Sequence, residues 1–175
     1  NTNNKIKIIA NLNYLFQTSK FDGNIIEING NIENSLFYSV SSFKNNVVTL
    51  NGNSPQYIVS LMNNNLNQNI EIENNKFIIN DPEIWKADSK HFIFLYDITI
   101  NNYDINIINN TIEASNQTNS QALIQLHSIH DTMPQSINIS NNKYGIFKRI
   151  IFYNNQVSHT ILIDGKEITY STSLE

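Results

Sequence analysis

The feature that most constrains this chain is a short phrase that recurs along it. Two apolar residues, separated by one residue of any kind, are followed closely by Asn-Asn or Asn-Gly. The phrase begins at Ile26, Val48, Ile70, Ile105 and Ile137. Alternation with a period of two is typical of a β-strand, and asparagine and glycine favour turns. The chain is therefore predicted to form many short strands, each closed by a turn.

The spacing of the phrases indicates a repeat architecture. The steps from Ile26 to Val48 and from Val48 to Ile70 are both 22 residues long. The next steps, to Ile105 and then to Ile137, are 35 and 32 residues long. Such a pattern is typical of a solenoid whose coils share one core and carry insertions at one corner.

The composition fits this interpretation. The 175 residues include 33 asparagines and 30 isoleucines, and only 15% of residues are charged. Isoleucine favours buried, pleated surfaces, while asparagine tolerates left-handed turns and can stack in ladders of side-chain amides. An AT-rich genome would also enrich both residues, but it would not place the asparagines at the same point of each phrase.

Three of the phrases carry a family resemblance. The segments 70–77, 105–112 and 137–144 each contain alternating apolar residues, an Asn pair and a further apolar residue. They resemble the repeats of the pectate-lyase-like right-handed β-helix superfamily. The resemblance implies an all-β fold, a right-handed parallel β-helix. The main alternative is an antiparallel β-sandwich, which also has short strands and turns but does not predict matched Asn pairs.

The length suits a single domain. We expect an initial strand or cap in residues 1–20, β-helix coils in 21–145 and terminal strands in 146–173. Asp164-Gly165 between two strand-like runs is a hairpin signal, and such a hairpin would cap the stack. Leu174-Glu175 resembles a cloning scar, so we expect the chain to be an excised fragment.

The tract from Asp81 to Asp97 has a different composition from its surroundings. It lacks asparagine and holds the only tryptophan. It could form a short helix begun by Asp81, or a loop that places an aromatic ring and carboxylates against a sugar. The alternative is a solvated loop with the tryptophan folded onto the core. The candidate substrate-binding residues of this tract are Trp85, Asp81, Glu83 and Asp88.

Four residues are candidates for catalysis. Asp97 and Asp104 could form the carboxylate pair that glycoside hydrolysis requires. His130 and Asp131 end a His-x-x-His-Asp sequence that begins at His127 and could supply a general base. The histidines would converge only if a turn intervened, because positions three apart lie on opposite faces of a strand. Ordinary surface residues are the alternative in both cases.

The charge and hydropathy of the sequence limit the classes of partner that we expect. The net charge is −4 and Arg149 is the only arginine, so the chain has no basic stripe for nucleic acid. No apolar run approaches the length that spans a membrane. We expect no cofactor and no metal, and a polysaccharide or cell-surface glycan as partner. Homo-oligomerisation stays open.

The resemblance leaves two functional classes. The first is a structural, glycan-contacting module of a larger phage-tail or bacterial surface protein, located outside the cell, on its surface or on a virion. The second is a polysaccharide-degrading enzyme, a glycoside hydrolase or a lyase. An enzyme requires several polar residues that converge in one groove.

Overall fold

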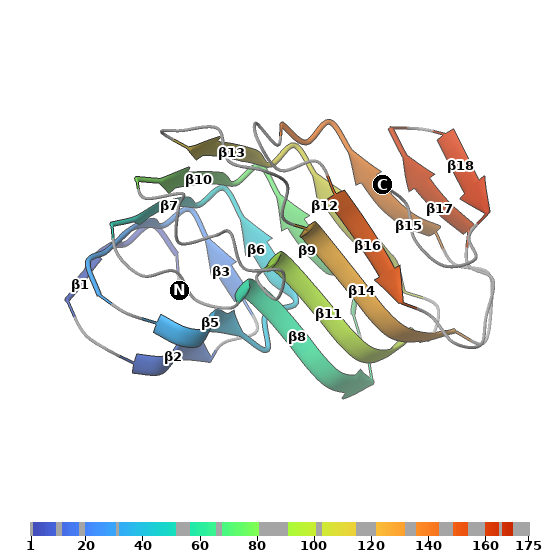
Figure 1. Cartoon of the computed structure of the whole chain (residues 1–175), viewed down its shortest axis with the longest axis horizontal. Coiled ribbons are helices and arrows are strands. Elements are labelled where there is room, and N and C mark those ends of the chain that lie inside the picture. Colours follow the sequence, from blue (N-terminus) through green and yellow to red (C-terminus); the bar gives the residue numbers. More distant parts are fainter. Residues whose placement is uncertain are drawn as a thin grey trace.

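The structure is a computed structural model of the chain (Figure 1). It describes residues 2–9, 12–17, 20–30, 32–51, 57–65, 68–80, 91–100, 103–114, 122–131, 136–143, 149–153, 160–164 and 166–169. All regular structure within these ranges is β-strand, in 18 strands, and the described residues form no helix. The prediction of an all-β fold is confirmed.

The strands form three sheets, numbered here in the order in which the chain meets them. Sheet 1 contains β1 (Lys5–Ile8), β4 (Ile25–Ile28), β7 (Val47–Leu50), β10 (Lys76–Ile79) and β13 (Thr111–Ala114). Sheet 2 contains β2 (Leu12–Gln17), β5 (Ile32–Tyr38), β8 (Tyr57–Asn65), β11 (His91–Ile100), β14 (Ala122–Asp131) and β16 (Arg149–Tyr153). Sheet 3 contains β3 (Lys20–Asp22), β6 (Ser42–Lys44), β9 (Ile70–Glu73), β12 (Ile105–Ile108), β15 (Ser136–Ser140), β17 (Thr160–Ile163) and β18 (Lys166–Thr169).

From β1 to β15 the chain visits the three sheets in turn, one strand in each, and then returns to sheet 1 one level further along (Figure 1). One such circuit is called a coil below. Every strand pairing between the described strands is parallel, except that of β17 with β18. This arrangement is consistent with a parallel β-helix. It excludes the antiparallel β-sandwich for the described part of the chain.

The register corrects one part of the sequence prediction. Val48 pairs with Phe77 of β10 rather than with Ile70, because the phrases at Ile26 and Val48 lie in sheet 1. The phrases that begin at Ile70, Ile105 and Ile137 lie in sheet 3 and align there in register. The second step of 22 residues is therefore not a coil length, since it joins two different sheets. Both sheets show the same alternation, which is why their phrases look alike.

Apolar residues of successive coils stack inside the three sheets. In sheet 1, Ile26, Val48, Phe77 and Ile112 align in one row, and each is at most 5% exposed. The intervening residues on β4, β7 and β10 face outward and are partly buried or, at Ile25, exposed. The period of two in the sequence therefore corresponds directly to one buried face and one outer face of each short strand.

Aromatic rings fill the core of the first coils. Phe43 of β6 lies 5.9 Å from Phe21, 4.6 Å from Phe37 and 6.1 Å from Phe77, measured between ring centroids. All four rings are almost fully buried. Rings at these separations add favourable interactions to the burial of their apolar area. The stack of phenylalanines therefore links sheets 1, 2 and 3 across the interior.

Sheet 2 departs from the regularity of the other two. Its strands lengthen from six residues in β2 to ten in β11 and β14, and the longer ones curve visibly in Figure 1. Four consecutive residues of β8, Ile58 to Leu61, are at most 1% exposed. Since successive residues of a strand point to opposite faces, both faces of β8 are covered at this level.

The last two strands form the hairpin that Asp164-Gly165 predicts. β17 pairs parallel to β15, and β18 returns antiparallel to β17. Asp164 has a φ of 48°, and its Oδ1 accepts a hydrogen bond from the Asn141 amide at 2.8 Å. No helix in the described ranges is long and apolar enough to cross a membrane.

Candidate functional site

The turn between sheets 3 and 1 has the same design in successive coils. The first residue of each turn lies in the left-handed region, with φ between 55° and 58° in Asn45, Asn74, Asn109 and Asn141. Asparagine tolerates this conformation better than most residues with a side chain. The second residue of each turn points inward. Asn24, Asn46, Asn75 and Asn110 at this position are buried, while the equivalent Asn142 is partly buried and Asn4, at the end of the stack, is exposed.

The inward asparagines form a continuous ladder along the stack. The Oδ1 of Asn75 accepts hydrogen bonds from both the backbone amide and the Nδ2 of Asn46, at 3.0 and 3.1 Å. The Nδ2 of Asn75 also donates to the Phe43 carbonyl at 2.7 Å. The same pairing recurs at every rung between Asn4 and Asn142. The buried amides are thereby satisfied, so the Asn pairs of the sequence have a structural role.

A polar groove lies where the chain passes from sheet 2 into sheet 3. It is open to solvent, has a volume of about 380 Å³ and crosses several coils, because its lining comes from β3, β6, β9 and the segments before β9 and β12. It combines one aromatic side chain with hydroxyl, amide and charged groups. The lining residues are Lys20, Ser42, Gln68, Asn69, Glu71 and Tyr103.

Hydrogen bonds from both backbone and side chains hold this groove in place. The amide of Asp104 donates to Asn69 Oδ1 at 3.0 Å, and the amide of Ile70 donates to the Asp104 carbonyl at 2.9 Å. Gln68 Nε2 donates to Ser41 Oγ, and Tyr103 packs against the core. These contacts join neighbouring coils, so the polar groups that face the groove are anchored at more than one level of the stack.

Charged side chains continue from the groove along the outer face of sheet 3. Lys44 Nζ lies 2.6 Å from Glu71 Oε2 and 3.8 Å from Glu73 Oε2. Partial burial lowers the pKa of Lys44, but the hydrogen bond and charge of Glu71 oppose it. The further negative charges of Glu73 and Asp22 also favour the ammonium form, and the net effect is a raised pKa. Lys44 is therefore a fixed positive charge at neutral pH, paired with Glu71.

On sheet 1 a second carboxylate is held in its charged form. Asn29 Nδ2 donates to Glu27 Oε1 at 2.9 Å, and Lys7 Nζ lies 3.2 Å from the same oxygen. The hydrogen bond from Asn29, followed by that from Lys7, lowers the pKa of Glu27 below its usual value. A carboxyl group with a lowered pKa is poorly suited to act as a general acid at neutral pH.

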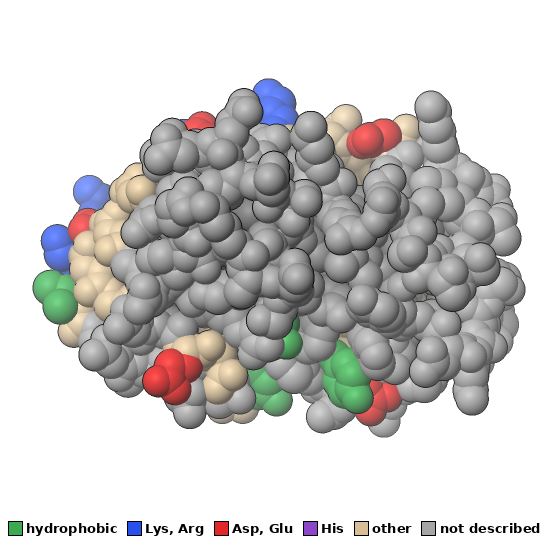
Figure 2. Space-filling model, in the orientation of Figure 1, with side chains coloured by type: hydrophobic (Ala, Val, Ile, Leu, Met, Phe, Trp, Pro, Cys, Tyr) green, Lys and Arg blue, Asp and Glu red, His purple; other side chains and the backbone are tan. Residues whose placement is uncertain are grey.

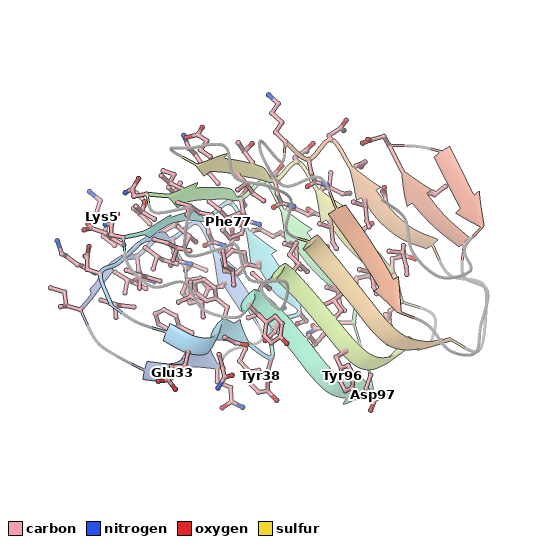
Figure 3. All side chains as sticks on the ribbon, viewed as in Figure 1. Lys5, Glu33, Tyr38, Phe77, Tyr96 and Asp97 are labelled. Atoms are coloured by element: carbon pink, nitrogen blue, oxygen red, sulfur yellow. The ribbon has the colours of Figure 1, made fainter. Side chains whose placement is uncertain are left out.

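The structure places the predicted catalytic residues in three places, one beside the groove and two on sheet 2. Asp104 precedes β12 beside Tyr103, and its backbone bonds to Asn69 bring it to the edge of the groove. Asp97 is exposed on β11 with a φ of 51°, next to Tyr96 at the lower rim of the molecule in Figure 3. His130 and Asp131 end β14, where their backbones pair with Thr99 and Ile100.

The predicted substrate-binding residues Trp85, Asp81, Glu83 and Asp88, and with them the proposed short helix, lie outside the described residues. The sequence analysis did not identify the groove residues themselves. Gln68, Asn69 and Glu71 are close in the sequence, but Lys20, Ser42 and Tyr103 each come from a different coil. An alignment of coils on the ladder asparagines would have brought Ser42 and Glu71 to the same strand position.

Within the described part of the chain, no group of three or more His, Cys, Asp or Glu side chains is arranged to hold a metal ion. Figure 2 shows Lys, Asp and Glu side chains dispersed around the rim of one face, with no concentration of positive charge among the coloured residues. Comparisons of this chain with protein-family models, with curated proteins and with solved structures found no match.

Proposed function

We propose that this chain is a structural, glycan-contacting module with the right-handed parallel β-helix fold of the pectate-lyase-like superfamily. The fold part of the proposal is supported by the three parallel sheets and by the repeated Asn turn. Right-handed connection is the rule for parallel strands joined by a crossover. A virion or a bacterial surface is the proposed location.

The single observation that carries the glycan proposal is the groove over sheet 3. It runs across successive coils, which suits an extended polymer better than a compact ligand. Glycans bind through aromatic rings that contact the apolar face of a sugar and through polar groups that pair with hydroxyls. Tyr103 supplies such a ring, while Gln68, Asn69 and Glu71 supply amide and carboxylate groups beside it.

The contacts between coils that hold the groove in place favour binding of a ligand. Its groups are held by contacts between coils, so little conformational freedom is lost when a ligand binds. A stack of hydrogen-bonded coils is also a stiff support, which suits a module that presents a binding surface at a distance from its attachment.

The test is a binding screen of the purified chain against bacterial and plant polysaccharides, with Tyr103→Leu as the informative variant. Leucine retains apolar packing against the core but removes the ring, so retention on a bound glycan should fall about fivefold, the effect of losing roughly 1 kcal/mol. Tyr96→Leu is the matched control, because Tyr96 is also half-buried but lies on sheet 2. Equal loss in both variants, or no retained glycan at all, would contradict the proposal.

The enzyme alternative is tested on the same panel. Reducing-sugar release without new absorbance at 235 nm would indicate hydrolysis, and new absorbance would indicate β-elimination. In the first case Asp97→Asn and Asp104→Asn would be compared, since hydrolysis requires two carboxyl groups about 5–10 Å apart. The binding-module proposal predicts retention of a glycan with neither product.

A further inference from the structure

The asparagine ladder has a direction. At each rung the backbone amide and Nδ2 of one asparagine donate to the Oδ1 of the asparagine in the following coil. Asn24, for example, donates twice to Asn46 and accepts twice from Asn4. A ladder of this kind has an acceptor end and a donor end, and the two ends of the stack are therefore chemically different.

Asn4 is the acceptor end. Its amide and Nδ2 both donate to Asn24 Oδ1, at 3.1 Å each, and its carbonyl accepts from the amide of Ile25. Among the described residues, no donor reaches the Oδ1 of Asn4. In the interior rungs the same atom accepts two hydrogen bonds from the asparagine of the preceding coil. Asn4 therefore donates as the interior asparagines do, but its Oδ1 accepts no hydrogen bond from the described residues.

The strands around Asn4 are equally incomplete. β1, β2 and β3 are the end strands of their three sheets. Among the described residues, their outer sides carry a single isolated bridge, between Thr2 and Asp22 of β3, beside which the Asn3 amide donates to the Asp22 carbonyl. Ile6 and Ile8 of β1, which align with the buried Ile26 and Ile28, are only partly buried. Ile9 is 75% exposed and Ile25 is 49% exposed. A shallow pocket lined by Lys5, Ile6, Lys7, Ile25 and Glu27 lies along this end of sheet 1.

The opposite end of the stack is finished differently. After β17 the turn reaches Asp164 and then Gly165, where earlier coils have a ladder asparagine. β18 then runs antiparallel to β17 and becomes the last strand of sheet 3. An antiparallel last strand interrupts the parallel coil pattern, and in Figure 1 it closes sheet 3 at the far right.

We infer that the end of the stack formed by β1, β2 and β3 is an acceptor surface for one further parallel coil. The occupant that fits is a coil of the same three-strand design whose sheet 3 to sheet 1 turn carries an asparagine. The amide and Nδ2 of that asparagine would donate to Asn4 Oδ1, and its apolar residues would cover Ile6 and Ile8. The argument rests on continuity with the interior rungs, which already show this interface between neighbouring coils.

A second copy of this chain fits less well. Two copies joined end to end by a two-fold axis would bring together two acceptors, the Oδ1 atoms of their Asn4 residues. A copy added in the head-to-tail sense would present the antiparallel β18 in sheet 3. Neither arrangement reproduces the rung between Asn24 and Asn46.

The test adds a coil and measures its effect on β1. In an extended chain, residues 1–2 are replaced by a copy of residues 24–44, which places the copied Asn24 22 residues before Asn4, the spacing of Asn24 and Asn46. Because alternate amides of a parallel strand point to each neighbour, the β1 amides directed away from β4 should become protected. Their hydrogen exchange should slow about fivefold or more, the effect of one ordinary hydrogen bond.

Two controls make the result specific. An extension of the same composition in scrambled order should leave the β1 amides unprotected, and an extension in which the copied Asn24 is Ala should protect them less than the intact copy. Circular dichroism reports whether the added coil gains β-structure. An added coil that stays unfolded, equal protection by the intact and Ala copies, or protection of β1 by dimerisation of the unextended chain would each overturn the inference.

Discussion

Two regions of each coil differ in how much their lengths vary from one coil to the next. The unit that runs from sheet 3 through the Asn turn into sheet 1 keeps nearly constant length: β9 with β10 and β12 with β13 are pairs of four-residue strands separated by two residues. Sheet 2 and its flanking segments vary. The spacing of the ladder asparagines grows from 20 to 22, 29 and 35 residues and is then 32.

The difference shows how this fold tolerates insertions. The Asn turn fixes register, because every rung joins two coils through two hydrogen bonds. A residue inserted there would break the ladder and turn apolar residues outward. In sheet 2 the same insertion only lengthens a strand or a connection, and lengthening a connection costs little entropy. The polar groove lies where the chain passes from sheet 2 into sheet 3, and it therefore borders the part of the coil whose length varies.

The largest expected effect comes from the aromatic core that the constant unit encloses. Phe43→Ala should lower the free energy of unfolding by about 3–5 kcal/mol, because it leaves a cavity between Phe21, Phe37 and Phe77. Phe43→Leu, which retains more of the volume, should cost distinctly less. Urea denaturation followed by circular dichroism measures both. Equal losses in the two variants would mean that the volume of the cavity does not determine the loss of stability.

The next prediction compares the two asparagines of one turn. Asn75→Gly should cost about 2–4 kcal/mol, because Asn46, Asn110 and the Phe43 carbonyl lose buried hydrogen bonds. Asn74→Gly should change stability by less than about 1 kcal/mol, because glycine accepts the left-handed conformation and Asn74 is exposed. The pair is measured by urea denaturation. If Asn74→Gly is the more harmful, the ladder is not what holds the turn.

A smaller loss of stability is expected when the turn residue in the left-handed conformation is replaced. Asn109→Ala places at a φ of 58° a residue without the short polar side chain that helps asparagine adopt this conformation, and it removes the hydrogen bond to Asn74 Oδ1. The expected loss is about 1–2 kcal/mol, and Asn109→Gly should recover most of it. Thermal unfolding of the two variants checks the prediction, which fails if alanine and glycine behave alike.

The smallest effect is a pH dependence on the outer face of sheet 1. Folding lowers the pKa of Glu27 through Asn29 and then Lys7. Its stabilising contribution is therefore present above the pKa of the unfolded chain and is lost as pH falls through the lower pKa of the folded state. Glu27→Gln should reduce the difference between melting temperatures measured at neutral and at acidic pH. An unchanged difference would show that Glu27 contributes no such linkage.

Much of the fold could be predicted because local signals and tertiary structure agree. The period of two at Ile70 and Ile72 marks a buried face, and the Asn pair after it marks the turn. The hairpin at Asp164 also follows from local chemistry. The equivalence of Val48 and Ile70 was wrong, because alternation identifies a strand without identifying the sheet to which it belongs.

The candidate site was less accessible from sequence. Asp104 was selected as a carboxylate, and the structure places its backbone beside the groove. Tyr103, one residue earlier, gave no local signal. Groove residues such as Lys20 and Glu71 are 51 residues apart in the chain and meet only because coils stack, so their proximity depends on the lengths of the intervening segments.

The sequence by itself determined that the chain forms short strands with one apolar face, turns at paired asparagines and a terminal hairpin. These features depend on the preferences of residues within a few positions of one another. Only the tertiary structure decided which strand joins which sheet, how the ladder is directed and where the polar groove lies. Those depend on register between coils, which is set by hydrogen bonds and packing between residues 20 to 35 positions apart.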